Sequence, residues 1–493
     1  THMALHNLQN PDSTLFTRRN LRCFLLIFLC FFLTSSGYLS WLYHLMTFIS
    51  PKAADLLTMG GGYAMQAAGL ALAAWFLFRR RNAIAPRQLF LLFIVIYTVC
   101  LIPALLSRSG AGTIIFGLIM NFFCGLIAAF YLHVLTFDTD GEFRSVLFGF
   151  SYAAATVAGW LLSLPTDRHF LQSPHVLIVY LVLAAALVIL ILIRIPLSED
   201  VPEDSGEEYR FSGNAPAASA LHKSPVSSAI PGLPLLAGAT ILVFSLVKNI
   251  GFGFPTADLY TGISLEASRV LYAIGLCIAG CIMEKNRKYG AVCTMAALVT
   301  PFLILSLSGE PVSQTIFWAL DYFVYAFFSV YRILLFSDLA KTRRIMYYAG
   351  LGLFFGRLGD SVGSSLSTIL AGRVTILVIL AALLFIAAIF LFFRLYQSLY
   401  MPVPDQPPSE QELFDRFSAR YGLSAREQEV LQLLLDKKTS PEIADTLFIS
   451  DRTVKFHIHN LLSKTGCRNR TDLLKQYRNG QPFPPQTGKK GVS

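Results

Sequence analysis

The chain has 493 residues, of which 54% are hydrophobic and only 14% are charged, and its formal net charge is +10. Its mean hydropathy of +0.57 excludes an ordinary water-soluble globular protein and is typical of a membrane protein. The eight cysteines show no metal-binding or disulfide spacing, and the sequence contains no nucleophile–base set or phosphate loop. We therefore expect no enzyme activity, no cofactor and no metal site.

Apolar segments of about twenty residues, the length needed to cross a bilayer, recur after an N-terminal cytoplasmic tail, 1–20. Six lie within residues 21–195, at 21–46, 56–78, 87–107, 111–136, 143–164 and 174–194. Six more lie within residues 233–396, at 233–255, 265–283, 288–307, 312–335, 345–370 and 374–396. The sequence thus predicts an all-α, polytopic membrane protein with twelve transmembrane helices in two sets of six.

The segment between the two sets, residues 196–232, begins with six acidic residues within ten positions and then turns to Ser, Ala and Pro. This composition cannot bury enough apolar surface to offset the entropy of folding. We therefore predict a disordered linker here, on the cytoplasmic side.

Basic residues alternate from one loop to the next, which indicates the orientation in the membrane. They gather before the first span, after the second, after the eighth and after the tenth, as Arg18, Arg19, Arg22, Arg79, Arg80, Arg81, Arg87, Lys285, Arg287, Lys288, Lys341, Arg343 and Arg344. The intervening loops hold few. Because positive charge stays on the cytoplasmic side, the pattern predicts a multi-pass membrane protein with both termini in the cytoplasm.

Six spans, a long cytoplasmic loop and six more spans resemble the major facilitator fold. Around the loop after the eighth span, the residues Gly280, Glu284, Arg287, Lys288 and Gly290 echo that family's loop signature of glycine, acid and paired basic residues. The equivalent place after the second span reads Phe78-Arg79-Arg80-Arg81, without the acid or the closing glycine. The resemblance implies a ligand site between the two halves, near mid-membrane.

Ionisable side chains within the spans are candidates for such a site, because charge is costly in lipid and usually faces the bundle interior. The candidate ligand-binding residues are Lys248 and Asn249 in the seventh span, Asp321, Tyr322 and Tyr325 in the tenth, and Arg357 and Asp360 in the eleventh. Two interpretations stay open. In the first, the residues contact an unknown small molecule, and an aromatic or apolar compound would be favoured by Tyr322, Tyr325, Phe252 and Phe254. In the second, Asp321 or Asp360 neutralises Arg357 or Lys248 within the bundle, without a ligand.

Residues 397–422 are predicted to be a Pro-rich linker and a short helix. Four prolines at 402, 404, 407 and 408 make a short, semi-rigid spacer. Residues 410–420 then place Leu413, Phe414 and Phe417 on one face of an amphipathic turn or two. Such a short, stiff tether could transmit a rearrangement of the membrane part.

Residues 423–480 predict four short helices, followed by a tail at 481–493. Ser424 and Glu427 form a capping box before an apolar run. Ser440 is predicted to cap the second helix, with Pro441 at its first position. Ser450 caps the third helix, and the fourth begins near Arg470.

The third of these helices presents two different faces. Val454, Ile458, Leu461 and Leu462 recur at helical spacing and predict a buried face. The opposite face is basic and partly aromatic, as a major-groove reader requires: Lys455 and His459 can reach base edges, and Phe456 can pack on a thymine methyl group. Phosphate contacts are predicted for Arg452, Lys464, Arg468 and Arg470. The alternative is a solvated basic face.

The pieces LSAREQEVL, PEIADTLFIS, TVKFHI and NLLSKTGCRNRTDLL follow one another in this segment. Together they resemble the LuxR/NarL-type helix-turn-helix family over the whole segment. The resemblance implies that the helix beginning near Ser450 enters the major groove of double-stranded promoter DNA, and that the last helix is the dimer contact.

Carried over position by position, the resemblance assigns base contacts to Lys455, Phe456 and His459 and backbone contacts to Thr453 and Lys464. It assigns dimerisation to the last helix, where we predict contacts by Leu473, Leu474 and Tyr477. Glu427 and Ile443 match positions that hold the motif together. Two positions depart from the family pattern, Lys437 in place of glycine and Ser440 in place of asparagine.

The sequence therefore favours a membrane-bound, one-component transcription regulator in which a facilitator-like domain senses a small molecule. Its expected partners are promoter DNA, the lipid bilayer, an unknown ligand and a second copy of the chain on DNA. Two alternatives stay open. One is a secondary transporter with an added regulatory DNA-binding domain, and the other is a DNA-binding domain merely anchored to the membrane.

Overall fold

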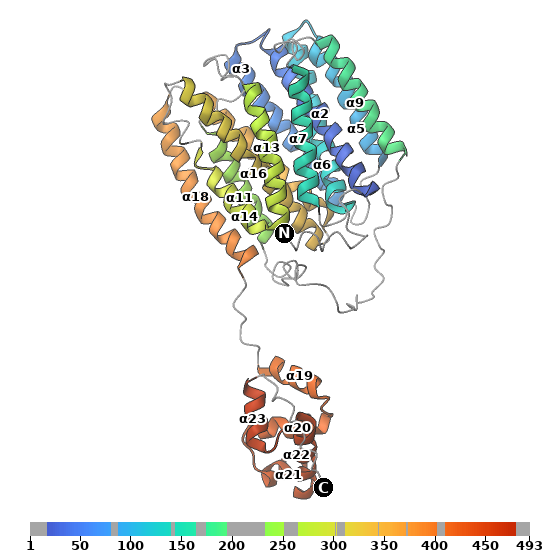
Figure 1. Cartoon of the computed structure of the whole chain (residues 1–493), viewed down its shortest axis with the longest axis vertical. Coiled ribbons are helices and arrows are strands. Elements are labelled where there is room, and N and C mark those ends of the chain that lie inside the picture. The colour runs from blue at the N-terminus through green and yellow to red at the C-terminus, as the bar shows by residue number, and fades with distance from the viewer. Residues whose placement is uncertain are drawn as a thin grey trace, which may run out of the picture. The chain divides into compact units, whose positions relative to one another are not determined.

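The computed structural model describes residues 17–79, 87–139, 143–163, 174–194, 232–250, 265–300, 302, 311–343, 345–370, 373–401 and 410–479. Within these ranges the elements are helices and turns without a β-strand, so the all-α prediction is confirmed for this part of the chain. The chain divides into two compact units, residues 1–401 and 402–493 (Figure 1). Most of the predicted tails at 1–20 and 481–493, and the linker at 196–232, lie outside the described residues.

The first unit is a bundle of long helices that run alongside one another (Figure 1). Its first half contains α2 (Arg18–Leu45), α3 (Pro51–Asp55), η2 (Leu56–Gly62), α4 (Tyr63–Arg79), α5 (Arg87–Leu106), α6 (Gly110–Phe137), α7 (Arg144–Ser163) and α9 (Pro174–Arg194). Its second half contains α11 (Leu233–Asn249), α13 (Leu265–Lys285), α14 (Arg287–Ala297), α16 (Pro311–Arg343), η5 (Met346–Tyr348), α17 (Leu351–Ile369) and α18 (Val374–Tyr400).

A helix lies over each apolar segment predicted from the sequence, but over the ninth segment, 288–307, α14 covers only Arg287–Ala297. The second segment is not a uniform α-helix, because η2 is a π-helix of seven residues between α3 and α4. The tenth and twelfth are longer than predicted, since α16 continues to Arg343 and α18 to Tyr400. Gly251 to Pro255, including Phe252 and Phe254, lie outside the described residues.

Several of these helices indicate a membrane-associated protein. Six in the described part of the chain are long and apolar enough to cross a membrane: Arg18–Leu45, Pro51–Arg79, Arg87–Leu106, Gly110–Phe137, Ala319–Arg343 and Thr375–Tyr400. Leu177–Ile193 and Leu233–Asn249 are shorter apolar helices. The prediction of twelve spans therefore stays a prediction, although long apolar helices are present in both halves.

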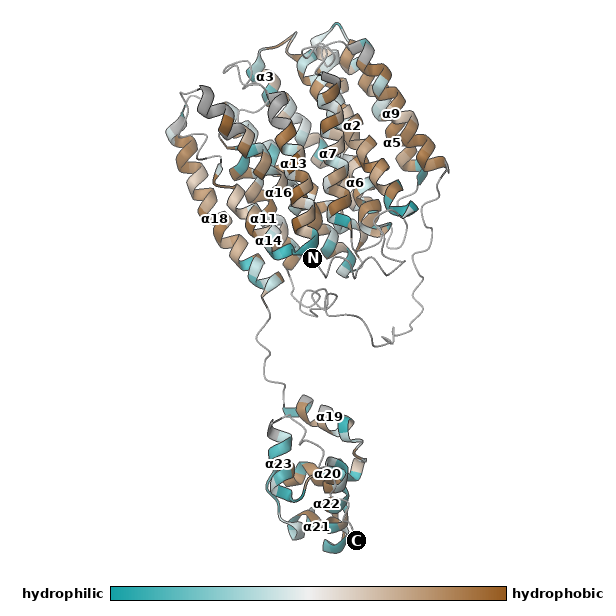
Figure 2. Cartoon of the chain, viewed as in Figure 1, coloured by the Kyte–Doolittle hydropathy of each residue, from teal (hydrophilic) through white to brown (hydrophobic). Residues whose placement is uncertain are grey.

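Apolar stripes on the outside of the bundle support this assignment. On α18 the exposed residues recur every three or four positions, as Ile376, Ile379, Leu383, Ile386, Phe390 and Phe393. On α5 they are Leu92, Val95, Val99, Ile102 and Leu106. Figure 2 shows α18 as hydrophobic over most of its length. Continuous exposed apolar surface of this kind is unfavourable in water, and lipid is the solvent that suits it.

The two halves meet through close helix packing. A Cβ atom on Gly149 of α7 would lie 2.5 Å from the carbonyl oxygen of Leu276 on α13, and one on Gly280 of α13 would lie 2.8 Å from that of Ser145. Glycine at both places lets the two backbones touch, which is how helices pack where no hydrophobic effect drives them together.

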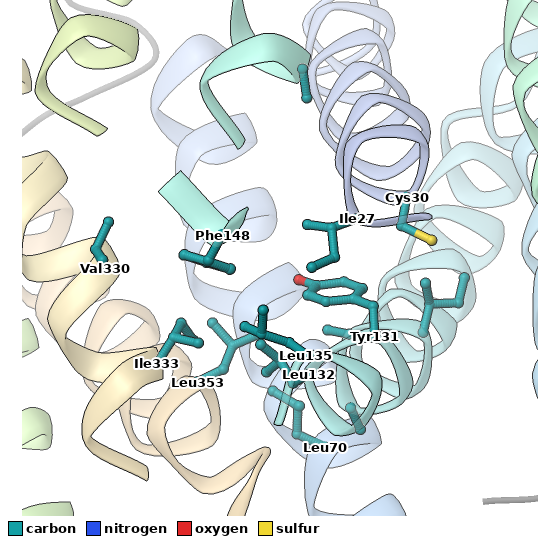
Figure 3. Close-up of a cluster of buried hydrophobic side chains, with 14 of the residues drawn as sticks. Ile27, Cys30, Leu70, Tyr131, Leu132, Leu135, Phe148, Val330, Ile333 and Leu353 are labelled. Atoms are coloured by element: carbon teal, nitrogen blue, oxygen red, sulfur yellow. The ribbon is translucent and has the colours of Figure 1, made fainter. Parts of the chain in front are cut away.

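An apolar core continues this contact between the halves (Figure 3). Ile27, Tyr131 and Phe148 come from the first half, and Val330, Ile333 and Leu353 come from the second. All six are buried. An ion pair also joins the halves, since a guanidinium nitrogen of Arg144 on α7 lies 2.9 Å from a carboxylate oxygen of Asp338 on α16.

The second unit consists of α19 (Glu410–Tyr421), α20 (Ala425–Leu435), α21 (Ser440–Leu447), α22 (Asp451–Thr465) and α23 (Arg470–Asn479). Its core gathers one or more side chains from every helix, among them Phe417, Leu431, Ile443, Val454 and Leu473. The short helix α19 is therefore part of this core. Its two phenylalanines, Phe414 and Phe417, are both buried there.

Candidate nucleic-acid interface

The outward face of α22 is set by the way the helix is capped and packed. Ser450 is the N-cap, and its hydroxyl accepts a hydrogen bond from the Thr453 N–H at 3.1 Å. Gly466 ends the helix at φ 72°, a left-handed conformation in which glycine is least strained. Val454 and Leu461 are fully buried and Ile458 packs against the same core, so the opposite side of the helix faces outward.

That outward face carries the predicted DNA-reading residues. Arg452, Lys455, Phe456 and His459 are all exposed. The Phe456 side chain is 59% exposed, so its ring is accessible to a partner. The Lys455 ammonium lies 2.7 Å from a carboxylate oxygen of Asp451 one turn earlier. Such an exposed pair contributes only about 0.3–0.5 kcal/mol, so a phosphate or base can replace it.

A partly buried hydrogen-bond network holds the end of α22 against the start of α20. The Glu427 carboxylate accepts from the Ser424 N–H at 2.7 Å and from the Lys464 ammonium at 2.6 Å. The same ammonium donates to the Gly422 carbonyl at 3.0 Å. Burial raises the pKa of Glu427, but the hydrogen bonds from Lys464 and Ser424 outweigh it and hold the pKa below its ordinary value.

Other predicted DNA contacts also make bonds inside the domain. Lys464 is the internal link just described, and Arg470 donates a hydrogen bond to the Lys438 carbonyl, which ties the start of α23 to the turn before α21. The Thr453 hydroxyl lies 2.7 Å from that of Ser450. Whether these three residues touch DNA stays a prediction, and the structure shows that each also supports the fold.

The cap of α21 differs from the prediction. Thr439, not Ser440, is the N-cap, because Thr439 has the extended backbone that this position requires and Ser440 is already helical. The Glu442 carboxylate accepts from the Thr439 N–H at 2.6 Å and from its hydroxyl at 2.8 Å. These bonds lower the pKa of Glu442. The sequence signal was a Thr-x-x-Glu capping box beginning one residue earlier.

The three predicted dimerisation residues on α23 have different environments. Leu473 is fully buried in the domain's own core, and its contact with a second copy stays a prediction. Leu474 and Tyr477 are partly exposed. The Tyr477 ring lies 5.3 Å from the Phe417 ring of α19, and its hydroxyl donates to the Glu410 carbonyl at 3.3 Å. Helix α19 thus packs along the face of α23 that carries Tyr477.

A second group of polar side chains lies inside the first unit and is called the Asp360 cluster here. It consists of Lys248, Asn249, Tyr63, Tyr325, Arg332, Arg357 and Asp360. One oxygen of Asp360 lies 3.1 Å from Nη1 of Arg332 and 3.5 Å from Nη1 of Arg357. Its other oxygen accepts a hydrogen bond from Nδ2 of Asn249 at 2.7 Å.

Aromatic rings cover the cations of this cluster. The Lys248 ammonium lies 3.5 Å from the centroid of the Tyr325 ring, and the Arg357 guanidinium lies 4.3 Å from that of Tyr63. The structure therefore brings Lys248, Asn249, Tyr325, Arg357 and Asp360 together, and ligand binding by them stays a prediction. Arg357 pairs with Asp360, which was one of the pairings that the sequence left open.

Two other predicted ligand residues make different contacts. Asp321 is buried and accepts a hydrogen bond from the Thr300 hydroxyl. The Tyr322 ring is buried, with its centroid 6.0 Å from that of Tyr272. The sequence did not point to Tyr63 as part of the site. The signal that could have found Tyr63 is the preceding Gly60-Gly61-Gly62, because three glycines in an apolar segment mark a close approach of another helix.

Comparison with known proteins concerns the second unit. The family model described as bacterial regulatory proteins, luxR family, matches residues 422–476. The spore germination protein GerE of Bacillus subtilis is 46% identical over 58 residues, which are 12% of this chain and 78% of that protein.

Two longer relatives match the same domain. The transcriptional regulatory protein LiaR of Bacillus subtilis is 49% identical over 50 residues, 10% of this chain and 24% of that protein. The transcriptional regulatory protein DegU of Brevibacillus brevis is 41% identical over 59 residues, 12% of this chain and 25% of that protein. The chain thus spans about a quarter of the length of these two relatives.

Proposed function

The chain belongs, through residues 422–476, to the luxR family of bacterial regulatory proteins, and on that premise we propose that it is a membrane-bound, one-component transcription regulator. The observation that carries the proposal is the exposed face of α22, with Lys455, Phe456 and His459, in the same chain as a bundle of long apolar helices. Such a protein reads promoter DNA at the membrane surface without a separate sensor protein.

In this proposal α22 enters the major groove. Lys455 and His459 contact base edges, Phe456 packs on a thymine methyl group, and Arg452 contacts a phosphate. Thr453, Lys464 and Arg470 lie toward the backbone and at the same time stabilise the fold. Two copies bind a two-fold operator, with Leu474 and Tyr477 of α23 at the dimer contact.

The membrane part of the proposal is a facilitator-like domain of twelve spans with both termini in the cytoplasm of a bacterium. Its support is the distribution of Lys and Arg along the sequence, together with the apolar stripes on α5 and α18. This orientation exposes the DNA-reading domain to the compartment that contains DNA. The ligand is a small molecule bound at the Asp360 cluster between the halves.

Helix α19 provides the coupling between ligand and DNA. Residues 402–409, which include four prolines, join the end of α18 to α19. Because Phe417 of α19 packs on Tyr477 of α23, a displacement of α19 changes how much of α23 is available to a second copy. A ligand that favours one arrangement of the halves would in this way change the population of DNA-binding dimers.

The test compares transcript levels in cells with the intact protein and cells with Lys455→Ala and His459→Ala together. Arg426→Ala is the matched control, since Arg426 is an exposed basic residue of the same domain that pairs with Glu429 on α20. We expect the double variant to lose regulation of a small set of genes and the control to keep it. Unchanged transcripts, combined with reduced uptake of a substrate in cells lacking the protein, would instead support the transporter.

The anchored-domain alternative needs a second comparison. If the membrane part only anchors the protein, a fragment beginning at Glu410 regulates the same genes to the same extent under every growth condition. If the membrane part senses a ligand, the fragment no longer responds to the growth medium.

A further inference from the structure

The contact between the halves beside the Asp360 cluster is irregular in backbone and very close. The π-helix η2 of the first half packs against α17 of the second. The Ser361 hydroxyl of α17 donates to the Gly60 carbonyl of η2 at 2.6 Å, and a Cβ atom on Gly60 would lie 2.5 Å from the Ser365 hydroxyl. Short π-helical stretches inside long helices occur frequently at functional sites. Tyr63, whose ring covers Arg357, directly follows η2.

The charges within the cluster are unequal around Asp360. The guanidiniums of Arg332, on α16, and Arg357, on α17, approach the same carboxylate oxygen. In the part of the chain that the structure describes, Asp360 is the only carboxylate paired with either arginine. The Nε atoms of both arginines are buried without a hydrogen-bond partner. An excess guanidinium in a desolvated bundle is costly, and a second carboxylate would neutralise it.

We infer that Arg357 binds the carboxylate group of a small organic anion, while Arg332 stays paired with Asp360. The two arginines differ in access, since the Arg357 side chain is 18% exposed and the Arg332 side chain is 4% exposed. The planar guanidinium of arginine matches a carboxylate with two parallel hydrogen bonds. The inference rests on the proposed function and narrows its ligand from any small molecule to a carboxylate.

This arrangement also gives the anion a way to act on the bundle. Arg357 and Asp360 lie one turn apart on α17, so releasing Arg357 from Asp360 leaves the link between α16 and α17 through Arg332 intact. The Arg357 guanidinium that pairs with Asp360 also lies over the Tyr63 ring of the first half. A bound carboxylate therefore changes the contact between α17 and the first half, where the halves meet, without breaking the second half apart.

The unfolding midpoint of the ligand-free protein distinguishes an anion site from a purely structural role of Arg357. If Arg357 only holds the bundle together, Arg357→Gln lowers the thermal unfolding midpoint of the full chain in lipid nanodiscs. If Arg357 is an excess cation awaiting an anion, Arg357→Gln raises that midpoint and Asp360→Asn lowers it. The control is Arg144→Gln, which breaks the pair between the buried Arg144 and the partly exposed Asp338 and lowers the midpoint in either case.

The binding test uses benzoate, hexanoate and succinate as probes, with benzamide as the uncharged counterpart of benzoate. We expect at least one carboxylate to raise the unfolding midpoint of the wild-type chain and of Arg144→Gln, and benzamide to leave both unchanged. Arg357→Gln loses this response, and Arg357→Lys, which keeps the charge, retains a weaker one. The inference is overturned if no carboxylate shifts the wild type, if Arg357→Gln responds as the wild type does, or if Arg357→Gln lowers the ligand-free midpoint.

These measurements need no DNA, so they are separate from the test of the proposed function. Carboxylate binding that depends on Arg357, together with transcripts that do not respond to Lys455→Ala and His459→Ala, supports the anion site and refutes the regulator. The reverse combination supports the regulator and refutes the anion site.

Discussion

Glu427 joins α20 to α22 in the DNA-binding domain. The variant Glu427→Gln tests how much this contact stabilises the domain. The carboxylate is buried, with 5% of the side chain exposed, and accepts from the Ser424 N–H at 2.7 Å and the Lys464 ammonium at 2.6 Å. A hydrogen bond to a charged group contributes about 1.5–3 kcal/mol. Glutamine keeps the shape and one acceptor but loses the charge, so we expect the free energy of unfolding to fall by about 2 kcal/mol.

The assay is urea unfolding of the second unit, from Glu410 onward, as a function of pH. The pKa of Glu427 is depressed in the folded state, so its contribution is present above its ordinary value of 4.5 and is lost as the pH falls through the depressed value. The difference in the free energy of unfolding between wild type and Glu427→Gln should therefore be largest at neutral pH. It should shrink as the pH falls through the depressed pKa of Glu427. Arg426→Gln, which breaks an exposed pair, is the control and should cost less than about 0.5 kcal/mol. An equal cost for both variants, or a difference that persists unchanged at strongly acidic pH, would refute the reasoning.

Three further predictions concern the same domain. Lys437 has a φ of 60°, a left-handed conformation that costs a non-glycine residue about 1 kcal/mol or more. Lys437→Gly should therefore raise the free energy of unfolding, measured in urea, by about 1 kcal/mol. The control Lys438→Gly should not raise it. Phe417→Ala removes a buried ring that packs on Tyr477 and should destabilise the domain by about 3 kcal/mol. Because the variant uncovers the face of α23 that carries Tyr477, sedimentation should also show more dimer. A purely monomeric variant would refute the coupling role of α19. Lys455→Ala should weaken binding to a promoter duplex by about 1–3 kcal/mol if it contacts a base, with loss of discrimination between sequences in a fluorescence titration; an equal loss on every sequence, with a smaller salt dependence, would identify a phosphate contact instead.

Local sequence patterns determined much of this protein. Helix caps such as Ser424 with Glu427 and Ser450 with Thr453 join residues three positions apart, so the pattern contains both partners. The apolar runs predicted the positions of the long helices, because a helix forms its backbone hydrogen bonds within its own segment. The buried and exposed faces of α22 follow from the spacing of Val454 and Leu461 against Lys455 and Phe456. Even the wrong cap of α21 was a choice between neighbouring residues, Thr439 and Ser440.

Only the tertiary structure decided the contacts between distant positions. Lys464 pairs with Glu427 and Arg332 pairs with Asp360. In neither pair does the local sequence around one residue indicate which distant residue is its partner. Tyr63 belongs with Arg357 because two helices from different halves meet, and Leu473 is a core residue because α23 turns that side inward. The physical reason is that local hydrogen bonds and periodicity specify each helix by itself. The partner of a buried charge or an apolar face depends on how the helices pack together.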